Sequence, residues 1–201
     1  MKSRWMLVLC LLALMSFPAL AQQEKPPAGM PPMDSPEMQA MMKAMSPGPE
    51  HKLLARMVGD WTFTNKMWMD PSAPPVEGSG TMHAEMILGG RHVHAVWKGS
   101  FAGMPFEGHA TEGYDNLTKK HVSSWVDNMS TGIMYSTGTC EQNGKVCTAT
   151  SAEMLDPMTG KMTSARSVVT WTGDNSFTLV MYMKPAGEAE TKSMEMTVKK
   201  K

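Results

Sequence analysis

The chain has 201 residues, of which 42% are hydrophobic, with 19 basic and 19 acidic side chains. This length suits one domain with a real hydrophobic core. The balanced charge provides no basic field that would attract nucleic acid or anionic lipid, so no nucleic-acid partner is expected.

Residues 1–21 have the features of a secretory signal peptide. Lys2 and Arg4 precede a short apolar run, and the small-residue sequence Ala-Leu-Ala ends at Ala21. This pattern predicts cleavage after Ala21. The apolar run is shorter than the roughly 20 residues of a spanning helix, and no later segment is apolar enough to cross a membrane. We therefore expect an exported protein, periplasmic or extracellular, without an integral membrane segment after signal removal.

Residues 22–49 are rich in proline, glutamine and methionine and contain no aromatic or β-branched residue. Such a segment cannot form a core by itself, so we expect a flexible tail. A short helix is expected within the tail, because Asp34 or Ser35 can cap it and Pro36 suits its first turn. The sequence Pro-Gly-Pro at 47–49 then ends the helix.

Four methionines, Met38, Met41, Met42 and Met45, fall on one face of this helix. One hypothesis is an apolar face that docks over a barrel mouth or a partner. A second is a set of soft thioether ligands, which select Cu(I) over harder ions. A third is a sacrificial role, in which exposed methionines are oxidised and then repaired.

Residues 50–200 are expected to form the folded domain, in which helical spacing gives way to short alternating runs separated by turn residues. We predict strands at residues 60–69, 78–88, 91–101, 105–114, 120–128, 132–141, 145–154, 161–171, 175–184 and 190–199. About ten strands joined by short turns indicate an all-β, antiparallel, up-and-down meander. Such a meander tends to close into a barrel, because closure removes exposed edges.

The segment HKLLARMVGDW, residues 51–61, predicts a short amphipathic helix that is followed by Gly59 and Trp61. This Gly-x-Trp entry resembles the start of calycin barrels such as lipocalins, in which the tryptophan plugs one end behind a short helix. The motifs MVGDW, MWMDP, ILGGR, GMPFEG, GYDN, WVDNMSTGI and DPMTGK together resemble a domain-of-unknown-function family of small, often exported bacterial proteins. The resemblance covers roughly residues 50–200. It implies a calycin-like β-barrel and brings no biochemical activity with it.

Strand alternation predicts which side chains face the barrel interior. The inward set comprises Trp61, Phe63, Met67, Met86, Val93 and Trp97. In the hairpin around Gly89-Gly90, Leu88 is expected on the same apolar face, whereas Asn65 interrupts that face on the first strand. A lumen of methionine, tryptophan and phenylalanine suits a small apolar ligand. The alternative is that these side chains simply fill a small barrel.

The opposite face of the same hairpin carries His83, His92 and His94, with Glu85 expected across from His94. A His-x-His pair with a carboxylate can complete a zinc or copper site, although histidines on a polar strand face are more often simply solvated. No histidine follows His121, so a haem ligand on the late strands is absent and haem is not expected.

Cys140 and Cys147 flank the sequence EQNGKV. A two-residue Asn143-Gly144 turn would place them opposite each other at a hydrogen-bonded position, with Cα atoms about 5.5 Å apart. In an oxidising compartment a disulfide is expected. A redox-active pair is the alternative.

No spacing singles out a nucleophile, an oxyanion loop or a phosphate cradle, so a non-enzymatic function is favoured. The leading hypothesis is the binding of a small apolar or amphipathic molecule in the barrel. The alternative is periplasmic copper binding or handling through the tail methionines and the histidine patch. An enzyme acting on a ligand in the barrel would need a polar group in the lumen, such as Asn65 or an inward histidine.

Overall fold

The computed structural model describes residues 29–101, 103–141 and 143–201, so the predicted signal peptide lies outside the described residues. The helical elements are α1 (Pro36–Met45), α2 (Pro49–Leu54) and the 3-10 helix η1 (Ala55–Met57). The strands are β1 (Gly59–Met67), β2 (Val76–Ile87), β3 (His92–Phe101), β4 (Met104–Asp115), β5 (Lys120–Asp127), β6 (Met134–Glu141), β7 (Val146–Ser151), β8 (Met154–Leu155), β9 (Met162–Gly173), β10 (Ser176–Pro185) and β11 (Thr191–Lys200). Among these elements, no helix combines the length and apolar character needed to span a bilayer.

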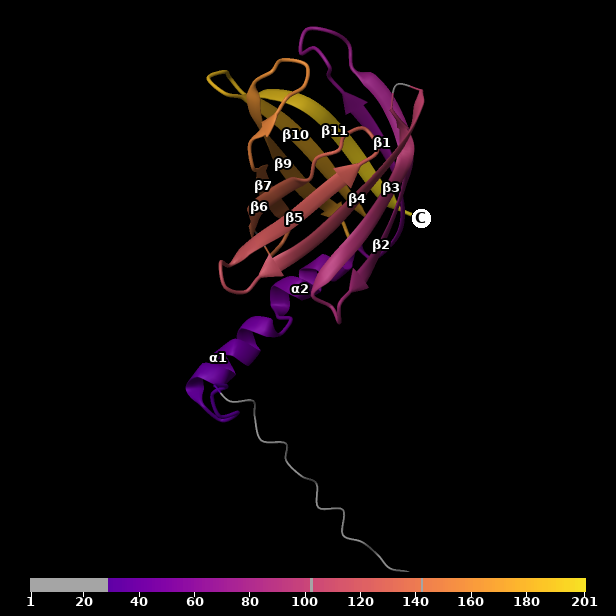
Figure 1. Cartoon of the computed structure of the whole chain (residues 1–201). Coiled ribbons are helices and arrows are strands. Elements are labelled where there is room, and N and C mark those ends of the chain that lie inside the picture. The colour runs from indigo at the N-terminus through magenta and orange to yellow at the C-terminus, as the bar shows by residue number, and fades with distance from the viewer. Residues whose placement is uncertain (1–28, 102, 142) are drawn as a thin grey trace, which may run out of the picture. The chain divides into compact units, whose positions relative to one another are not determined.

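Within the described residues, ten antiparallel strands close into a barrel (Figure 1). Most strands that pair in the barrel also follow one another in the chain, as expected for an up-and-down meander. Closure comes from β1, which pairs with β11, and from β9, which pairs with both β7 and β10. The two-residue β8 lies beside β9 as a short addition. The predicted calycin-like fold class is therefore confirmed.

The predicted strand ends agree with the structure to within two residues, except in one strand. The strand expected at 145–154 ends at Ser151, and Met154–Leu155 forms the separate β8. The predicted register of the β2–β3 hairpin is confirmed, since Glu85 pairs with His94. The loop geometry is not as predicted, because Gly90 N and Arg91 N both donate to Ile87 O. As a result Leu88 lies in the loop at φ 51° and is exposed, rather than on the apolar face.

Both α-helices begin at residues that satisfy free backbone donors. Ser35 Oγ accepts a hydrogen bond from Met38 N at 3.2 Å at the start of α1. At the start of α2, Gly48 N donates to His51 Nδ1 at 3.0 Å. Proline occupies the first position of each helix, where its missing N–H removes no intrahelical bond. The short helix predicted around residues 36–46 is thus present.

The C-terminal turn of α1 is hydrogen-bonded to loops of the barrel, and the residues from Ala40 onward form one compact unit with it. Asn116 Nδ2 donates to the carbonyl oxygens of Ala44 and Ser46, at 2.9 and 2.8 Å. Arg91 Nε donates to Met45 O at 3.1 Å. These bonds satisfy carbonyl groups that have no partner inside the helix.

The segment α2–η1 covers one end of the barrel behind Trp61, as predicted. Trp61 is fully buried, and its indole Nε1 donates to Met57 O at 2.8 Å. Its ring packs edge-to-face against Trp171 and Phe177. Arg56 stacks over the Trp171 ring at 4.2 Å. An aromatic cluster of this size contributes much of the core stability at this end.

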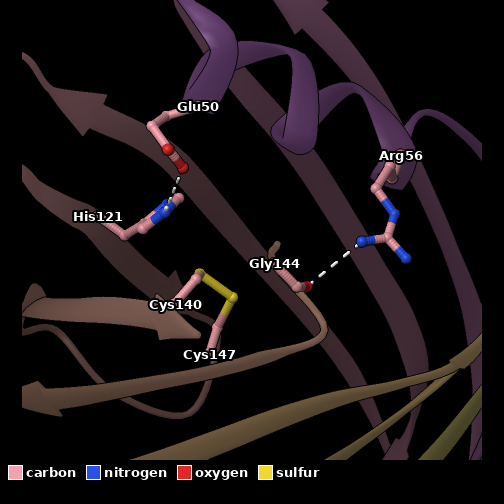
Figure 2. Close-up of a disulfide and its surroundings, with 6 residues drawn as sticks. All are labelled: Glu50, Arg56, His121, Cys140, Gly144 and Cys147. Carbon is pink, nitrogen blue, oxygen red and sulfur yellow. Dashed lines mark hydrogen bonds and ion pairs between the residues drawn. A yellow bond between two sulfur atoms is a disulfide. The ribbon is translucent and has the colours of Figure 1, made fainter. Parts of the chain in front are cut away.

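A disulfide joins Cys140 and Cys147 across the β6–β7 hairpin, as predicted (Figure 2). Their Cα atoms are 4.0 Å apart, which is the short separation of a non-hydrogen-bonded pair rather than the expected 5.5 Å. The reason is the loop, in which Gly144 N and Lys145 N both donate to Glu141 O. The prediction of a two-residue turn was therefore wrong, although the pairing of the two cysteines was right.

Figure 2 also shows how the helical segment is attached on either side of this disulfide. Glu50 Oε2 lies 3.7 Å from His121 Nε2. Arg56 Nη1 donates to Gly144 O at 3.3 Å. The covering segment is thus held to β5 and to the β6–β7 loop by polar links in addition to Trp61.

Candidate functional site

The interior of the barrel holds a cavity of about 1140 Å³. Its lining begins at Leu53 and Arg56 in the covering segment and reaches the loop 128–133 between β5 and β6. Ligand pockets typically have volumes of about 300–1000 Å³, so this space can hold a drug-sized molecule. The side chains therefore line the barrel rather than fill it.

One wall of the cavity is rich in thioethers. In the pairing of β1, β11 and β10, Met194 lies directly between Met67 and Met181. All three side chains line the cavity, as do Met183 and Met196. We call Met67, Met194 and Met181 the methionine row. Flexible, polarisable thioethers adapt to ligands of irregular shape, which suits a binding wall.

A second part of the wall is polar. Glu112 of β4 pairs with Ser123 of β5, and Ser123 pairs with Ser136 of β6. The three side chains line the cavity and follow one another across three neighbouring strands. We call them the polar row. The cavity is therefore amphipathic, with a hydrogen-bonding strip in an otherwise largely apolar lining.

The charged or titratable residues that line the cavity are Arg56, Glu112, His121 and Asp127. Three of them have partners: Arg56 and His121 make the links described above, and Asp127 Oδ2 accepts from Trp125 Nε1 at 2.7 Å. Burial lowers the pKa of His121, an effect that Glu50 partly opposes.

Glu112 differs from the other three because it forms no hydrogen bond or ion pair with any described residue. Burial alone raises the pKa of its carboxyl from 4.5 to about 7. A carboxyl group in apolar surroundings favours its neutral form, since the charged form loses its hydration there. Glu112 is thus a proton-bearing or weakly ionised group that faces the lumen.

Asn65 also carries an unsatisfied group. Its Oδ1 is buried and has no hydrogen-bond partner among the described residues. It lies beside Gly78, at which an added Cβ would come within 2.6 Å of Oδ1. Buried polar atoms without partners are rare, and a ligand or water that donates a hydrogen bond would satisfy this one.

The residues predicted to line the lumen divide into two groups. Phe63, Met67 and Trp97 line the cavity. Trp61 and Val93 are fully buried in the core, and Met86 packs against that core. Strand alternation thus predicted that these side chains point into the barrel, but it did not predict which of them line the cavity and which pack in the core. The inward position of Glu112 was not predicted, although its spacing of two residues from Ala110, which is buried, was a signal that this carboxylate faces inward.

The predicted histidine patch does not come together as one cluster. His83 Nδ1 lies 2.8 Å from Asp60 Oδ1, and His94 Nε2 lies 3.2 Å from His109 Nδ1. His92 lies against Gly113 instead. In the described part of the chain, no three His, Cys, Asp or Glu side chains are arranged to hold a metal ion.

The methionines of α1 are not equally accessible. Met41, Met42 and Met45 have 44%, 48% and 56% of their surfaces exposed, whereas Met38 is buried at 2%. Three thioethers of the predicted stripe are therefore available to solvent, and Met41 and Met45 are four residues apart, which makes them neighbours on the helix surface.

Residues 46–200 match the family described as "Protein of unknown function (DUF1579)". The chain belongs to this family. The family description assigns no activity that could be transferred to the DUF1579 domain here, and a comparison with curated proteins gave no match.

Among solved structures, the DUF1579 domain resembles the crystal structure of Rv2717c from M. tuberculosis, with a TM-score of 0.59 and 13% identity. The match covers 78% of this chain and 99% of that chain. A redesigned β-barrel, b11L5F_LGL, matches with a TM-score of 0.37 and 13% identity over 75% of this chain and 94% of that one. EF1p2_mFAP2b bound to DFHBI matches with a TM-score of 0.40 and 12% identity, over 75% and 98%. The likeness to Rv2717c supports the barrel fold alone.

Proposed function

We propose that this DUF1579 protein binds a small apolar or amphipathic molecule in the lumen of its barrel and does not alter it chemically. The observation that carries the proposal is the cavity of about 1140 Å³, whose lining combines the methionine row with aromatic rings. Phe63 and Trp97 have ring centroids 5.5 Å apart, and Phe106 stacks on Trp125 at 6.2 Å. Concave, mainly apolar cavities with a few polar groups are typical of small-molecule sites.

Binding is favoured over catalysis by the way the polar groups are arranged. Among the described residues that line the cavity, no serine hydroxyl is hydrogen-bonded to a histidine or a carboxylate. An activated nucleophile needs a base within hydrogen-bond reach. The serines of the polar row are thus suited to hold a ligand rather than to attack it.

We further propose that the protein acts in the periplasm or outside the cell. The features of residues 1–21 support export. The Cys140–Cys147 disulfide supports an oxidising compartment, where such bonds persist. The compartment is tested by fractionating cells that express the full chain and by sequencing its N-terminus, which should begin at Gln22.

Ligand binding is tested with the neutral fluorophore N-phenyl-1-naphthylamine, whose emission rises in apolar surroundings. Replacing Ala149, which lines the cavity, with phenylalanine should weaken binding by roughly tenfold or more, because the new ring occupies the lumen. The matched control is Thr150→Phe, which adds the same ring to the exposed face of the same strand and should leave binding unchanged. Absence of fluorophore binding, or equal loss in both variants, would contradict the proposal.

A second candidate function is Cu(I) binding through α1, favoured by the exposure of Met41, Met42 and Met45. Soft thioethers select Cu(I), and a Met41–Met45 pair presents two of them to one ion. Native mass spectrometry under reducing conditions should then detect Cu(I) uptake that is lost when both are changed to leucine. Uptake that survives in this double variant would exclude the α1 pair as the site.

A further inference from the structure

We infer that the molecule bound in the barrel carries a positively charged, hydrogen-bond-donating head group, such as a protonated amine, on an apolar body, and that the polar row binds this head group. The inference rests on the proposed function, because it specifies the ligand of the same cavity. Its basis is the polar row of Glu112, Ser123 and Ser136, which lies across the barrel from the methionine row.

The polar row can engage one compact group. Glu112 and Ser123 are direct neighbours in the β4–β5 register, and Ser123 and Ser136 in the β5–β6 register. Directly paired residues on one sheet face have Cβ atoms about 4.5–5.5 Å apart. An ammonium group has several donors within such a span, so it can bond to the carboxylate and to a neighbouring serine hydroxyl together.

No residue of the described chain already neutralises Glu112. Its sheet neighbour on the other side is Val93 of β3, which is uncharged. On the same face of the sheet the neighbouring titratable side chains are Tyr114, two residues further along β4, and His121 of β5, which pairs with Tyr114 and lies toward Glu50 of α2. Arg56, which also lines the cavity, is stacked on Trp171 and bonded to Gly144 O. Glu112 is therefore an unpaired acid in a cavity, and a cationic ligand would supply the missing partner.

The remaining lining fits the rest of such a ligand. Trp125 lies two residues from Ser123 on the same face of β5, and its ring lines the cavity. Aromatic faces attract cations in addition to offering apolar contact. The methionine row provides an adaptable apolar surface for the body of the ligand. An anionic head group at the polar row is disfavoured, because it would face the carboxyl of Glu112, whereas Arg56 lies in the covering segment and is stacked on Trp171.

The high pKa of Glu112, raised to about 7 by burial, agrees with this assignment. In the empty barrel the carboxyl is partly protonated at neutral pH. A bound cation favours the carboxylate, so binding below pH 7 should release a proton. A neutral ligand of the same length would cause no such release.

The test compares three probes that share one alkyl chain: decylamine, decanol and decanoate. Each displaces N-phenyl-1-naphthylamine from the purified protein at about pH 8, below its micelle concentration. Wild type should bind decylamine roughly tenfold more tightly than decanol, and decanoate most weakly. Glu112→Gln should remove the preference for the amine over the alcohol, while the fluorophore still binds. Retained fluorophore binding shows that the variant is folded and its cavity intact.

The matched control is Glu107→Gln, which removes a carboxylate from the outer face of the same strand and should keep the amine preference. Equal binding of amine and alcohol by wild type, or an amine preference that survives Glu112→Gln, would overturn this inference and leave the proposed function standing. A protein that binds neither the fluorophore nor any of the three probes would overturn both.

Discussion

Replacing Trp61 with alanine is expected to lower the free energy of unfolding by about 3–5 kcal/mol. The side chain is fully buried and packs against Trp171 and Phe177 at the covered end of the barrel. Its loss removes apolar area and also leaves Met57 O without the indole donor. The covering segment would then lose one of its main attachments to the barrel.

Urea unfolding followed by circular dichroism measures this change. Trp68→Ala is the control, because Trp68 is only partly buried and its ring contacts Lys192 rather than the core. That substitution should have a cost of about 1 kcal/mol or less. Trp61→Phe should lie between the two, since phenylalanine restores most of the packing but not the hydrogen bond. Equal effects at Trp61 and Trp68 would show that the sequence-predicted plug is unimportant.

The free energy of unfolding of the protein without ligand is expected to fall as the pH rises from about 4.5 to 7, because of Glu112. Glu112→Gln should abolish this part of the pH dependence. The folded protein holds the proton more tightly than the unfolded chain, because burial raises the pKa of Glu112 from 4.5 to about 7. The favourable contribution is therefore complete below pH 4.5 and is lost as the pH rises to 7. The difference between wild type and variant should change by as much as about 3 kcal/mol across this window.

Denaturant unfolding at a series of pH values, with both proteins measured in parallel, gives this difference directly. Arg56, His121 and Asp127 line the same cavity and are unchanged in the variant, so the comparison isolates the effect of Glu112. Glu107 provides a control of opposite sign, because hydrogen bonds from His109 and Lys98 lower its pKa. Its stabilising effect is present above the unfolded pKa and is lost as the pH falls. Glu107→Gln should therefore lower the free energy of unfolding at neutral pH and leave it unchanged in acid. A constant difference between wild type and Glu112→Gln across the window would refute the assignment of the pH effect to this carboxyl.

Glu112 and Asn65 have a common feature that bears on function. Each presents a polar group to the barrel interior that no described residue satisfies. Such groups destabilise a protein unless something else compensates for them. Local violations of this kind are expected at functional sites, where a ligand provides the missing interaction. The two residues therefore support the proposal of ligand binding in the cavity more strongly than its volume does.

The sequence alone determined the strands, the covering helix, the disulfide pairing and the register of the β2–β3 hairpin. These features depend on alternation, turn residues and short spacings, all of which act between residues close together in the chain. The same local reasoning misplaced Leu88 and the ladder position of the two cysteines, because the β2–β3 and β6–β7 loops are both wider than a two-residue turn. Loop geometry depends on how the flanking strands twist, which the residue types in the turn do not fix.

Only the tertiary structure decided which inward side chains surround empty space. Trp61 and Phe63 share one face of β1, yet Trp61 is sealed in the core and Phe63 lines the cavity. The difference arises because β9 pairs with β10, which brings Trp171 and Phe177 together against Trp61, whereas Phe63 lies two residues further along β1. The polar row and the methionine row likewise assemble only across neighbouring strands. Alternation fixes the face of each side chain, whereas the closure and stagger of the barrel fix its neighbours.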